Sequence, residues 1–320
     1  MRTLHITAAL ATVLTLVTAT TFGAADDYIV IDLSGGPGAK SYPVTTLAAV
    51  PAGGWTNEHK TTKLVLRKIP KGTFIMGSPS GELGRYSDET QHQVTLTQDF
   101  HIGVFQVTQK QYELVMGTNP SSYKGDARPV ENVSYNTIRG ATTDGINWPD
   151  TGGSVKADTF LGRMRARTGL AFDLPTEAQW EYACRAGTVT ALNSGKNLTA
   201  ATGACPNMAE VGRYENNQND GKGGYTNTHT KVGMYLPNAW GLYDMHGNVW
   251  EWCLDCYVSD IGTAAASDPK GPATGPGRVL RGGRYNVAYH CRSACRDYDY
   301  PSNGSSYVGF RLYVPSALVQ

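Results

Sequence analysis

Glycine and proline occur along the whole length of this chain, and this distribution limits the folds that it can adopt. The 320 residues include 37 glycines and 16 prolines, and no single linker gathers them. Because both residues interrupt regular secondary structure, long helices and long strands are excluded over most of the chain. The 18 tyrosines and 6 tryptophans supply large surfaces for a core. The composition therefore predicts a loop-rich globular domain, and neither a helical bundle nor a repeat array.

Two short segments carry complete helix signals. In TQKQYELVMG, Thr108 is placed as an N-cap, Gln111 lies at the capping-box spacing, and Gly117 follows the last turn. In LPTEAQWEYACRAG, residues 176 and 179 repeat the Thr-x-x-Gln spacing, and Gly187 supplies the stop. Both segments are predicted to be helices of about two turns.

Strand signals dominate the region between residues 63 and 108. The segment KLVLRKIPKGTFIMGS predicts a hairpin, with two β-rich runs joined by a Pro-Lys-Gly turn. The segment HQVTLTQDFHIGVFQVT alternates apolar and polar residues as half-buried strands do. We expect residues 26–62 to form an N-terminal extension or a small docking element, and residues 63–315 to form the main domain.

Residues 188–231 are polar, rich in glycine and asparagine, and without a clear period. Long irregular stretches inside a compact domain are uncommon. We therefore expect this stretch to be either mobile or organised by something else, such as a metal ion.

The N-terminus has the features of a secretory signal. Arg2 precedes an apolar run over residues 8–17, and Gly23 and Ala25 fit the positions before a cleavage site. Residues 1–25 are therefore predicted to be a signal peptide, and the mature protein to be secreted, periplasmic or held in the cell envelope. A buried N-terminal helix is the alternative. The apolar run is too short to span a bilayer, and no longer run follows.

The charge balance excludes some partners. The chain has 28 basic and 27 acidic side chains, with no long run of either sign. A nucleic-acid binder would show a strongly basic patch, and a membrane-surface binder a polybasic segment. We expect neither nucleic acid nor a membrane surface as partner.

Six cysteines suggest disulfides in an exported protein. Six cysteines allow 15 pairings, so the sequence by itself leaves the connectivity open. Cys253 and Cys256 form a Cys-x-x-Cys, for which a redox motif or part of a zinc site are alternatives. Structural disulfides are favoured because no βαβ context and no second Cys-x-x-Cys accompany the pair. The six lie at positions 184, 205, 253, 256, 291 and 295.

The order of several blocks resembles a known family. The chain contains FIMGSPSGE, HQVTL, FQVTQKQY, RPVENVSY, LPTEAQWEYACRAG, PNAWGLYDMHGNVWEWCLD, RVLRGGRYN, CRSACRD and VGFRL, in that order. The series resembles the sulfatase-modifying-factor, or formylglycine-generating-enzyme-like, domain over residues 63–313. The resemblance implies an irregular α+β fold similar to the C-type lectin fold.

Several residues that the resemblance leads us to expect are missing from this chain. Enzymes of this family oxidise a sulfatase cysteine to formylglycine and hold copper(I) between two cysteines, whose soft thiolates suit that ion. Val287 stands at the first copper position, and the second has no counterpart here. Arg284 replaces a family serine and brings a fixed positive charge. We therefore do not expect copper chemistry, and a shifted copper pair made by Cys291 and Cys295 is the alternative.

Calcium is the cofactor that the resemblance favours. Calcium takes six to eight oxygen ligands and accepts backbone carbonyls in irregular loops. The motif is HGNVWEW, residues 246–252. Its two tryptophans, Trp250 and Trp252, are expected to be core residues. An acid–base pair formed by its histidine and glutamate is the competing interpretation. The implied first site comprises His246, Asn248, Val249 and Glu251. The implied second site comprises Asn207, Met208, Asp220 and Lys222, with a solvated polar loop as its alternative.

The remaining expectations concern the cleft and one disulfide. The resemblance implies a Cys184–Cys291 bond and leaves the other four cysteines unassigned. The cleft side chains suggest an anionic or carbonyl-rich guest, because arginine makes forked contacts with such groups. Internal pairing of these arginines with Asp297, Asp299 or Glu251 is the alternative. The expected cleft residues are Arg281, Arg284, Tyr285 and Arg292, with Arg296 nearby.

Three functions follow from these patterns. The first is an exported, calcium-stabilised binding or scaffold module without copper oxidase chemistry, whose ligand is an unknown protein, peptide or glycan. The second is a formylglycine-generating oxidase with displaced metal ligands. The third is a structural component of a cell-surface assembly.

Overall fold

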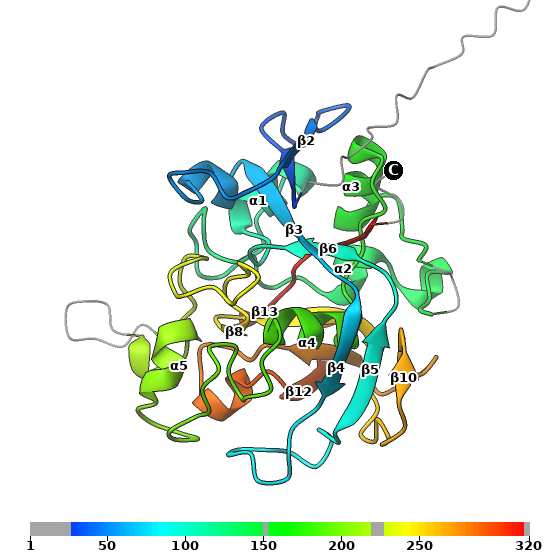
Figure 1. Cartoon of the computed structure of the whole chain (residues 1–320). Helices are drawn as coiled ribbons and strands as arrows, with labels where there is room; N and C mark the ends of the chain where they lie inside the picture. Colours follow the sequence, from blue (N-terminus) through cyan, green and yellow to red (C-terminus); the bar gives the residue numbers. More distant parts are fainter. Residues whose placement is uncertain (1–26, 150–152, 219–226, 317–320) are drawn as a thin grey trace, which may run out of the picture.

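The computed structural model describes residues 27–149, 153–218 and 227–316. Its helices are short and its strands lie in several small sheets (Figure 1). The α-helices are α1 (Gln109–Met116), α2 (Tyr135–Arg139), α3 (Phe160–Thr168), α4 (Glu177–Arg185) and α5 (Pro206–Val211). The 3₁₀ helices are η1 (Asn57–Lys60), η2 (Thr142–Asp144), η3 (Glu215–Asn217) and η4 (Ala288–Cys291).

The strands confirm a mixed, loop-rich α+β fold. They are β1 (Tyr28–Asp32), β2 (Val44–Leu47), β3 (Lys63–Ile69), β4 (Gly72–Met76), β5 (His92–Leu96), β6 (Phe100–Gly103), β7 (Gly212–Arg213), β8 (His246–Gly247), β9 (Trp250–Cys256), β10 (Ala266–Ser267), β11 (Arg278–Arg281), β12 (Arg296–Asp299), β13 (Val308–Gly309) and β14 (Tyr313–Pro315).

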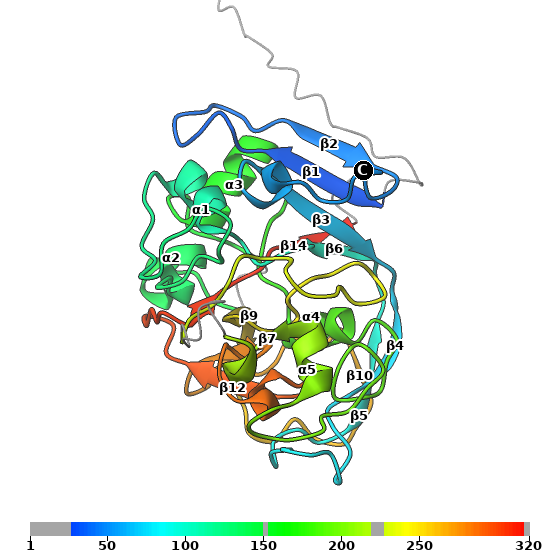
Figure 2. The same cartoon turned by 90° about the vertical axis from the view of Figure 1, so that its left-hand side faces the viewer.

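The largest sheet joins the two ends of the described chain. Its strand order is β14-β6-β3-β1-β2, and every pair is antiparallel. β1 pairs with β3 along its full length, from Tyr28 opposite Arg67 to Asp32 opposite Lys63. Residues 28–47 therefore share one sheet with the strands that follow, and this sheet lies at the top of both views (Figures 1 and 2).

The hairpin expected between β3 and β4 is wrong. β3 pairs with β1 and β6, whereas β4 pairs with β5 in a separate three-stranded sheet of order β10-β5-β4. Pro70 has no N–H to donate, and Lys71 donates its N–H to the Asp99 carboxylate at 2.9 Å. The chain therefore crosses from one sheet to the next at Pro70, and the strands that follow one another in a hairpin are β4 and β5.

The two predicted helices are confirmed as α1 and α4. Thr108 and Thr176 accept hydrogen bonds from the backbone N–H groups three residues on, with complete capping boxes. Gly117 ends α1 in the left-handed region, with φ of +84°. α4 ends differently from expectation, because Ala186 already adopts the left-handed conformation one residue before Gly187.

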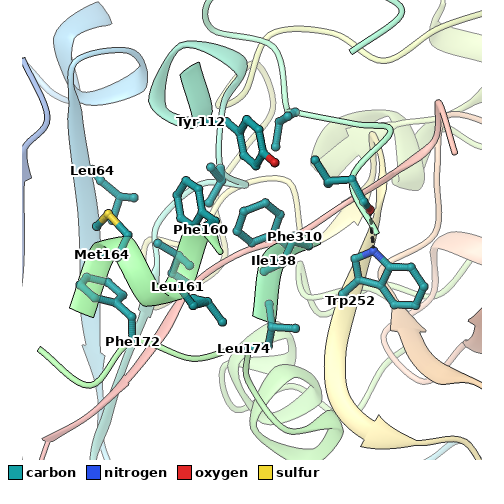
Figure 3. Close-up of a cluster of buried hydrophobic side chains, with 14 of the residues drawn as sticks. Leu64, Tyr112, Ile138, Phe160, Leu161, Met164, Phe172, Leu174, Trp252 and Phe310 are labelled. Atoms are coloured by element: carbon teal, nitrogen blue, oxygen red, sulfur yellow. Dashed lines mark hydrogen bonds between the residues drawn. The ribbon is translucent and has the colours of Figure 1, made fainter. Parts of the chain in front are cut away.

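The main core lies between the large sheet, helices α1 to α3 and strand β9 (Figure 3). Phe160 stacks on Tyr112 at 5.4 Å between ring centroids and meets Phe310 edge-on at 5.2 Å. Trp252 is fully buried, and its indole N–H donates to the Val133 carbonyl at 3.0 Å. Trp250 is also buried, so both tryptophans of the WEW motif are core residues as predicted.

The polar stretch over residues 188–231 contains a small apolar cluster of its own. Buried side chains of α5 and its flanks pack against Ala288 and Cys291 of η4. Apolar packing therefore organises the described part of this stretch, which the sequence pattern did not reveal. The members from the stretch are Ala191, Leu192, Leu198, Cys205, Met208, Val211 and Tyr214.

Candidate functional site

The candidate site surrounds the loop that joins β11 to η4. β11 is the second strand of the β12-β11-β9-β13 sheet, and α4 packs against both β9 and β11. Gly282 and Gly283 follow β11 with φ of +91° and +74°. A Cβ atom on Gly283 would lie 2.6 Å from the His290 carbonyl oxygen, so only glycine fits this turn. The turn places Arg284 and Val287 at the surface of the domain.

Two of the expected cleft arginines lie inside the protein. Arg281 and Arg292 are fully buried. Arg281 pairs with Glu181 and donates to the carbonyls of Ser293, Ala294 and Cys295. Its guanidinium therefore binds groups inside the protein and is not accessible to a ligand.

Arg292 and Arg296 are satisfied in the same way. Arg292 forms a bidentate pair with Glu89, and both of its contacts measure 2.6 Å. Arg296 holds Glu177 at 2.6 and 2.9 Å. The alternative of internal pairing is thus correct for these arginines, although the partners come from α4 and the 77–91 loop. They differ from those expected, Asp297, Asp299 and Glu251.

Arg284 and Tyr285 remain at the candidate site. The Arg284 guanidinium lies 4.1 Å from the centroid of the Tyr307 ring, and it has no ion pair among the described residues. Tyr285 is 6% exposed, and burial raises the pKa of its hydroxyl. An arginine stacked on tyrosine and otherwise unpaired can make forked hydrogen bonds to an incoming acceptor.

A buried pair of side chains that the sequence did not suggest lies beside Tyr285, whose ring centroid is 6.3 Å from that of His229. The His229 Nε2 atom is 3.6 Å from the Glu131 carboxylate, and both side chains are fully buried. Within the described part of the chain, neither ring nitrogen of His229 has a hydrogen-bond partner, and the Glu131 Oε2 atom has none. Burial lowers the pKa of His229, and the nearby Glu131 carboxylate only partly opposes that shift. No residue spacing connects segments this far apart, so only the tertiary structure reveals the pair.

Tyrosines form the exposed rim of the site, which we call the tyrosine surface. Tyr86 stacks on His290 with centroids 6.2 Å apart, and the two side chains meet through Tyr86 Oη and His290 Nε2 at 3.2 Å. Tyr298 stacks on Tyr257 at 4.4 Å. These side chains line a groove of about 380 Å³. Tyr86 and Tyr298 are each 42% exposed, so their rings can contact a ligand. The tyrosine surface comprises Tyr86, Arg284, His290, Tyr298 and Tyr307.

The thiols near the loop are closed off from this surface. Val287, which the resemblance places at the family's first copper position, is the N-cap of η4. Cys291 and Cys295 are fully buried, and the Cys291 Sγ atom faces the Arg284 carbonyl at 3.3 Å. Burial raises the pKa of Cys295 to about 12 and holds that of Cys291 well above its usual range.

All six cysteines are free thiols in the structure, so the expected Cys184–Cys291 disulfide is not formed in it. The His246 imidazole contacts both residues. Its Nε2 atom lies 3.9 Å from the Cys184 Sγ atom and accepts the Asn193 N–H, while its Nδ1–H donates to the Cys291 carbonyl at 2.6 Å. Burial lowers the pKa of His246 to about 4, so this histidine is neutral and structural.

The residues expected to bind the first calcium lie together, but their oxygens already accept hydrogen bonds. Glu251 is fully buried and takes a bidentate pair from Arg311 at 2.6 and 2.8 Å. The Trp180 indole donates to Glu251 at 2.7 Å. The Gln106 amide donates both to Glu251 at 2.9 Å and to the Val249 carbonyl at 3.0 Å.

The other two members of that set are engaged as well. The Asn248 side-chain oxygen accepts the Thr230 N–H at 2.9 Å, and His246 pairs through its backbone with Gly212. As arranged, these residues do not fit a calcium ion, because the side-chain oxygens of Glu251 and Asn248 already accept hydrogen bonds from protein donors. No group of three or more His, Cys, Asp or Glu side chains suited to a metal occurs in residues 27–149, 153–218 and 227–316.

The second expected calcium set is only partly described. Asn207 lies on α5 and donates from its side chain to the Asn197 carbonyl at 2.8 Å, and Met208 is buried in the apolar cluster. Asp220 and Lys222 lie outside the described residues, as does the expected signal peptide over residues 1–25.

The fold and the site define a loop-rich α+β domain of the formylglycine-generating-enzyme type. The family model described as "sulfatase-modifying factor enzyme 1-like domain" matches residues 55–315. The chain therefore belongs to the sulfatase-modifying-factor family.

Relatives in sequence and structure agree with that assignment. The formylglycine-generating enzyme of Mus musculus is 27% identical over 292 residues, which cover 80% of this chain and 77% of that protein. Treponema denticola variable protein 1 superposes with a TM-score of 0.61 and 27% identity, over 79% of this chain and 95% of that one. PvdO from Pseudomonas aeruginosa gives a TM-score of 0.61 and 26% identity, over 78% and 94%.

Among the helices that the structure describes, none combines the length and the apolar character required to cross a bilayer.

Proposed function

We propose that this protein is a binding module of the sulfatase-modifying-factor family that works without copper oxidase chemistry. Its ligand is a protein or peptide that docks on the tyrosine surface. The proposal includes export, which rests on Arg2 and the apolar run over residues 8–17.

One observation carries the proposal: the thiols near the β11–η4 loop are buried, whereas Tyr86 and Tyr298 in the groove beside it are exposed. Copper(I) needs accessible thiolates, and Val287 offers none. Cys291 and Cys295 lie below the surface with raised pKa values, which disfavours their thiolate forms. Tyrosine supplies rigid contact area with a hydroxyl at its tip, and binding surfaces use it for that reason.

An oxidase assay tests the absence of copper chemistry. The full chain, loaded with copper(I), is incubated with a Cys-x-Pro-x-Arg peptide, and mass spectrometry detects formylglycine. The mouse formylglycine-generating enzyme is the positive control. We expect no product above the metal-only background, and turnover by this chain would overturn the proposal. Should turnover occur, its loss in Cys291→Ser and Cys295→Ser would identify a shifted copper pair.

A display selection tests the tyrosine surface. Peptides selected for binding to the wild-type chain are measured against Tyr86→Ala and Tyr298→Ala. We expect each substitution to weaken binding by about tenfold or more, as removal of an aromatic anchor does. Val50→Ala is the control, because Val50 is similarly exposed but follows β2 in the large sheet. Selected peptides that bind both tyrosine variants like the wild type would remove the basis for this surface.

A further inference from the structure

A second pocket lies next to the groove of the tyrosine surface, and Arg296 of β12 lines both of them. It has a volume of about 240 Å³ and lies between β5, the start of α4, the end of β9 and the loop that contains β10. Its lining is mostly apolar and includes Met76, Ile261, Pro269 and Pro272. A concave apolar pocket with a few converging polar groups is the usual form of a small-molecule site.

Asp255 is one of the polar residues of this lining. The residue is 4% exposed, and its Oδ2 atom accepts a hydrogen bond from the Glu177 N–H at 2.8 Å. Among the described residues, no Lys, Arg or His forms an ion pair with Asp255. A buried carboxylate without a cation is costly, because burial removes its hydration and no opposite charge compensates for that loss.

The neighbouring cation is committed to another carboxylate. Arg296 gives two hydrogen bonds to Glu177, at 2.6 and 2.9 Å. Its remaining Nη1 donors reach the carbonyls of Asp88 and Val258 at 3.0 and 2.9 Å. Arg296 also lies 3.7 Å from the Asp88 carboxylate, so its ion pairs are with Glu177 and Asp88 and not with Asp255.

We propose that this pocket binds a small organic cation, an ammonium or amidinium group carried on a short apolar body. The cationic group pairs with Asp255, and the apolar body contacts Met76, Ile261 and the two prolines. The volume is below the ~300–1,000 Å³ of pockets that take drug-sized ligands, so the guest is small.

The affinity of this site depends on pH. Burial, and next the charge of Glu177, raise the pKa of Asp255 to about 7. A cation binds the ionised carboxylate, so affinity increases as pH rises through about 7 and levels off above it for as long as the guest remains protonated. The other ionisable or charged groups on the lining are Glu177 of α4, His92 of β5, Cys256 of β9, Arg296 of β12 and Asp260 of the loop before β10.

Calorimetric titration of the full chain with benzylammonium tests the proposal, with benzyl alcohol as the neutral isostere. We expect benzylammonium to bind at least about tenfold more tightly than the alcohol at pH above 7, a difference of about 1.4 kcal/mol. Asp255→Asn keeps an acceptor for the Glu177 N–H and removes the charge, and it should abolish this preference. Asp158→Asn is the control, because Asp158 is exposed and precedes α3.

A second variant keeps the proposal testable if Asp255→Asn does not fold. Ala266→Phe fills the apolar side of the pocket and leaves Asp255 in place. We expect it to lose benzylammonium binding, and retained binding would overturn the proposal. Equal binding of the two probes to the wild type would also overturn it. His92→Gln should leave the pH dependence unchanged, and loss of that dependence in this variant would overturn its assignment to Asp255.

Discussion

Replacing Glu251 by Gln tests whether an internal ion pair holds the GLYDMHGNVWEWCLD loop. In the folded protein both Glu251 oxygens accept: Oε1 from Arg311 and Gln106, and Oε2 from Arg311 and Trp180. Glutamine has one acceptor oxygen and one donor group. Whichever way its amide is turned, two of these donors face an N–H instead of an oxygen.

The expected loss of stability is large. Each buried donor left without a partner costs about 1–3 kcal/mol, and an uncompensated buried charge in a broken pair costs about 3–5 kcal/mol in total. Arg311 is fully buried and its other contacts are two carbonyls, so water does not replace the carboxylate. We therefore expect Glu251→Gln to lower the free energy of unfolding by about 3–5 kcal/mol.

Urea unfolding followed by tryptophan fluorescence and circular dichroism measures this change. Glu113→Gln is the matched control, because its partner Lys110 lies on the exposed side of α1. A surface pair of this kind should change stability by less than about 0.5 kcal/mol. Arg311→Met and the double variant give the coupling energy of the pair, and the double variant should lose less than the sum of the single losses.

The same experiment decides between the ion pair and calcium. If Arg311 satisfies Glu251, the urea midpoint of the wild type is the same with calcium and with a chelator. A loss below about 1 kcal/mol for Glu251→Gln would refute the magnitude argued above. A calcium-dependent rise in the wild-type midpoint that Glu251→Gln abolishes would show that Glu251 binds the ion, as the family resemblance implied.

Three further predictions follow. Thr176→Ala should destabilise the protein by about 1 kcal/mol in urea, because it removes the cap of α4, whereas Thr176→Ser should restore most of that loss. Burial raises the pKa of Cys184 and Cys295 to about 12, so both should resist a thiol reagent in the native state and react after denaturation. Cys205 should react before them: burial opposes its ionisation, but hydrogen bonds from Thr199 and backbone N–H groups outweigh burial and lower its pKa. Rapid native labelling of Cys295 would contradict this order. Asp255→Asn should be more stable than the wild type above pH 7. The pKa of Asp255 is higher in the folded protein than its ordinary value, so ionisation of this buried carboxyl destabilises the fold. The difference in stability should vanish toward pH 4, where the carboxyl is protonated in the folded protein. An unchanged difference in stability across that range would contradict the raised pKa.

Local patterns predicted the local structures well. The Thr-x-x-Gln spacings identified α1 and α4 because a capping box is made by residues three apart. The WEW motif was correctly placed in the core, since large aromatic residues in a loop-rich chain have few other places to pack. The series of family blocks was also sufficient for the fold, and the family model confirms the assignment.

The charged residues were predicted less well. Arg281 and Arg292 looked like cleft residues because arginine commonly binds anionic ligands, but their partners Glu181 and Glu89 come from distant segments. The β3–β4 hairpin failed for a similar reason. Two β-rich runs beside a turn do not say which strands they pair with, and each run found its partner in a different sheet.

The sequence by itself determined the two capped helices and the absence of a cysteine at position 287, because these depend on residues that are close along the chain or on the identity of a single residue. The series of family blocks determined the loop-rich α+β fold. The tertiary structure decided which charges are internal and which thiols are covered. It also placed His229 beside Glu131 and left Asp255 without an ion pair among the residues that the structure describes. Those properties depend on which distant segments pack together, because burial and ion pairing are set by neighbours in space.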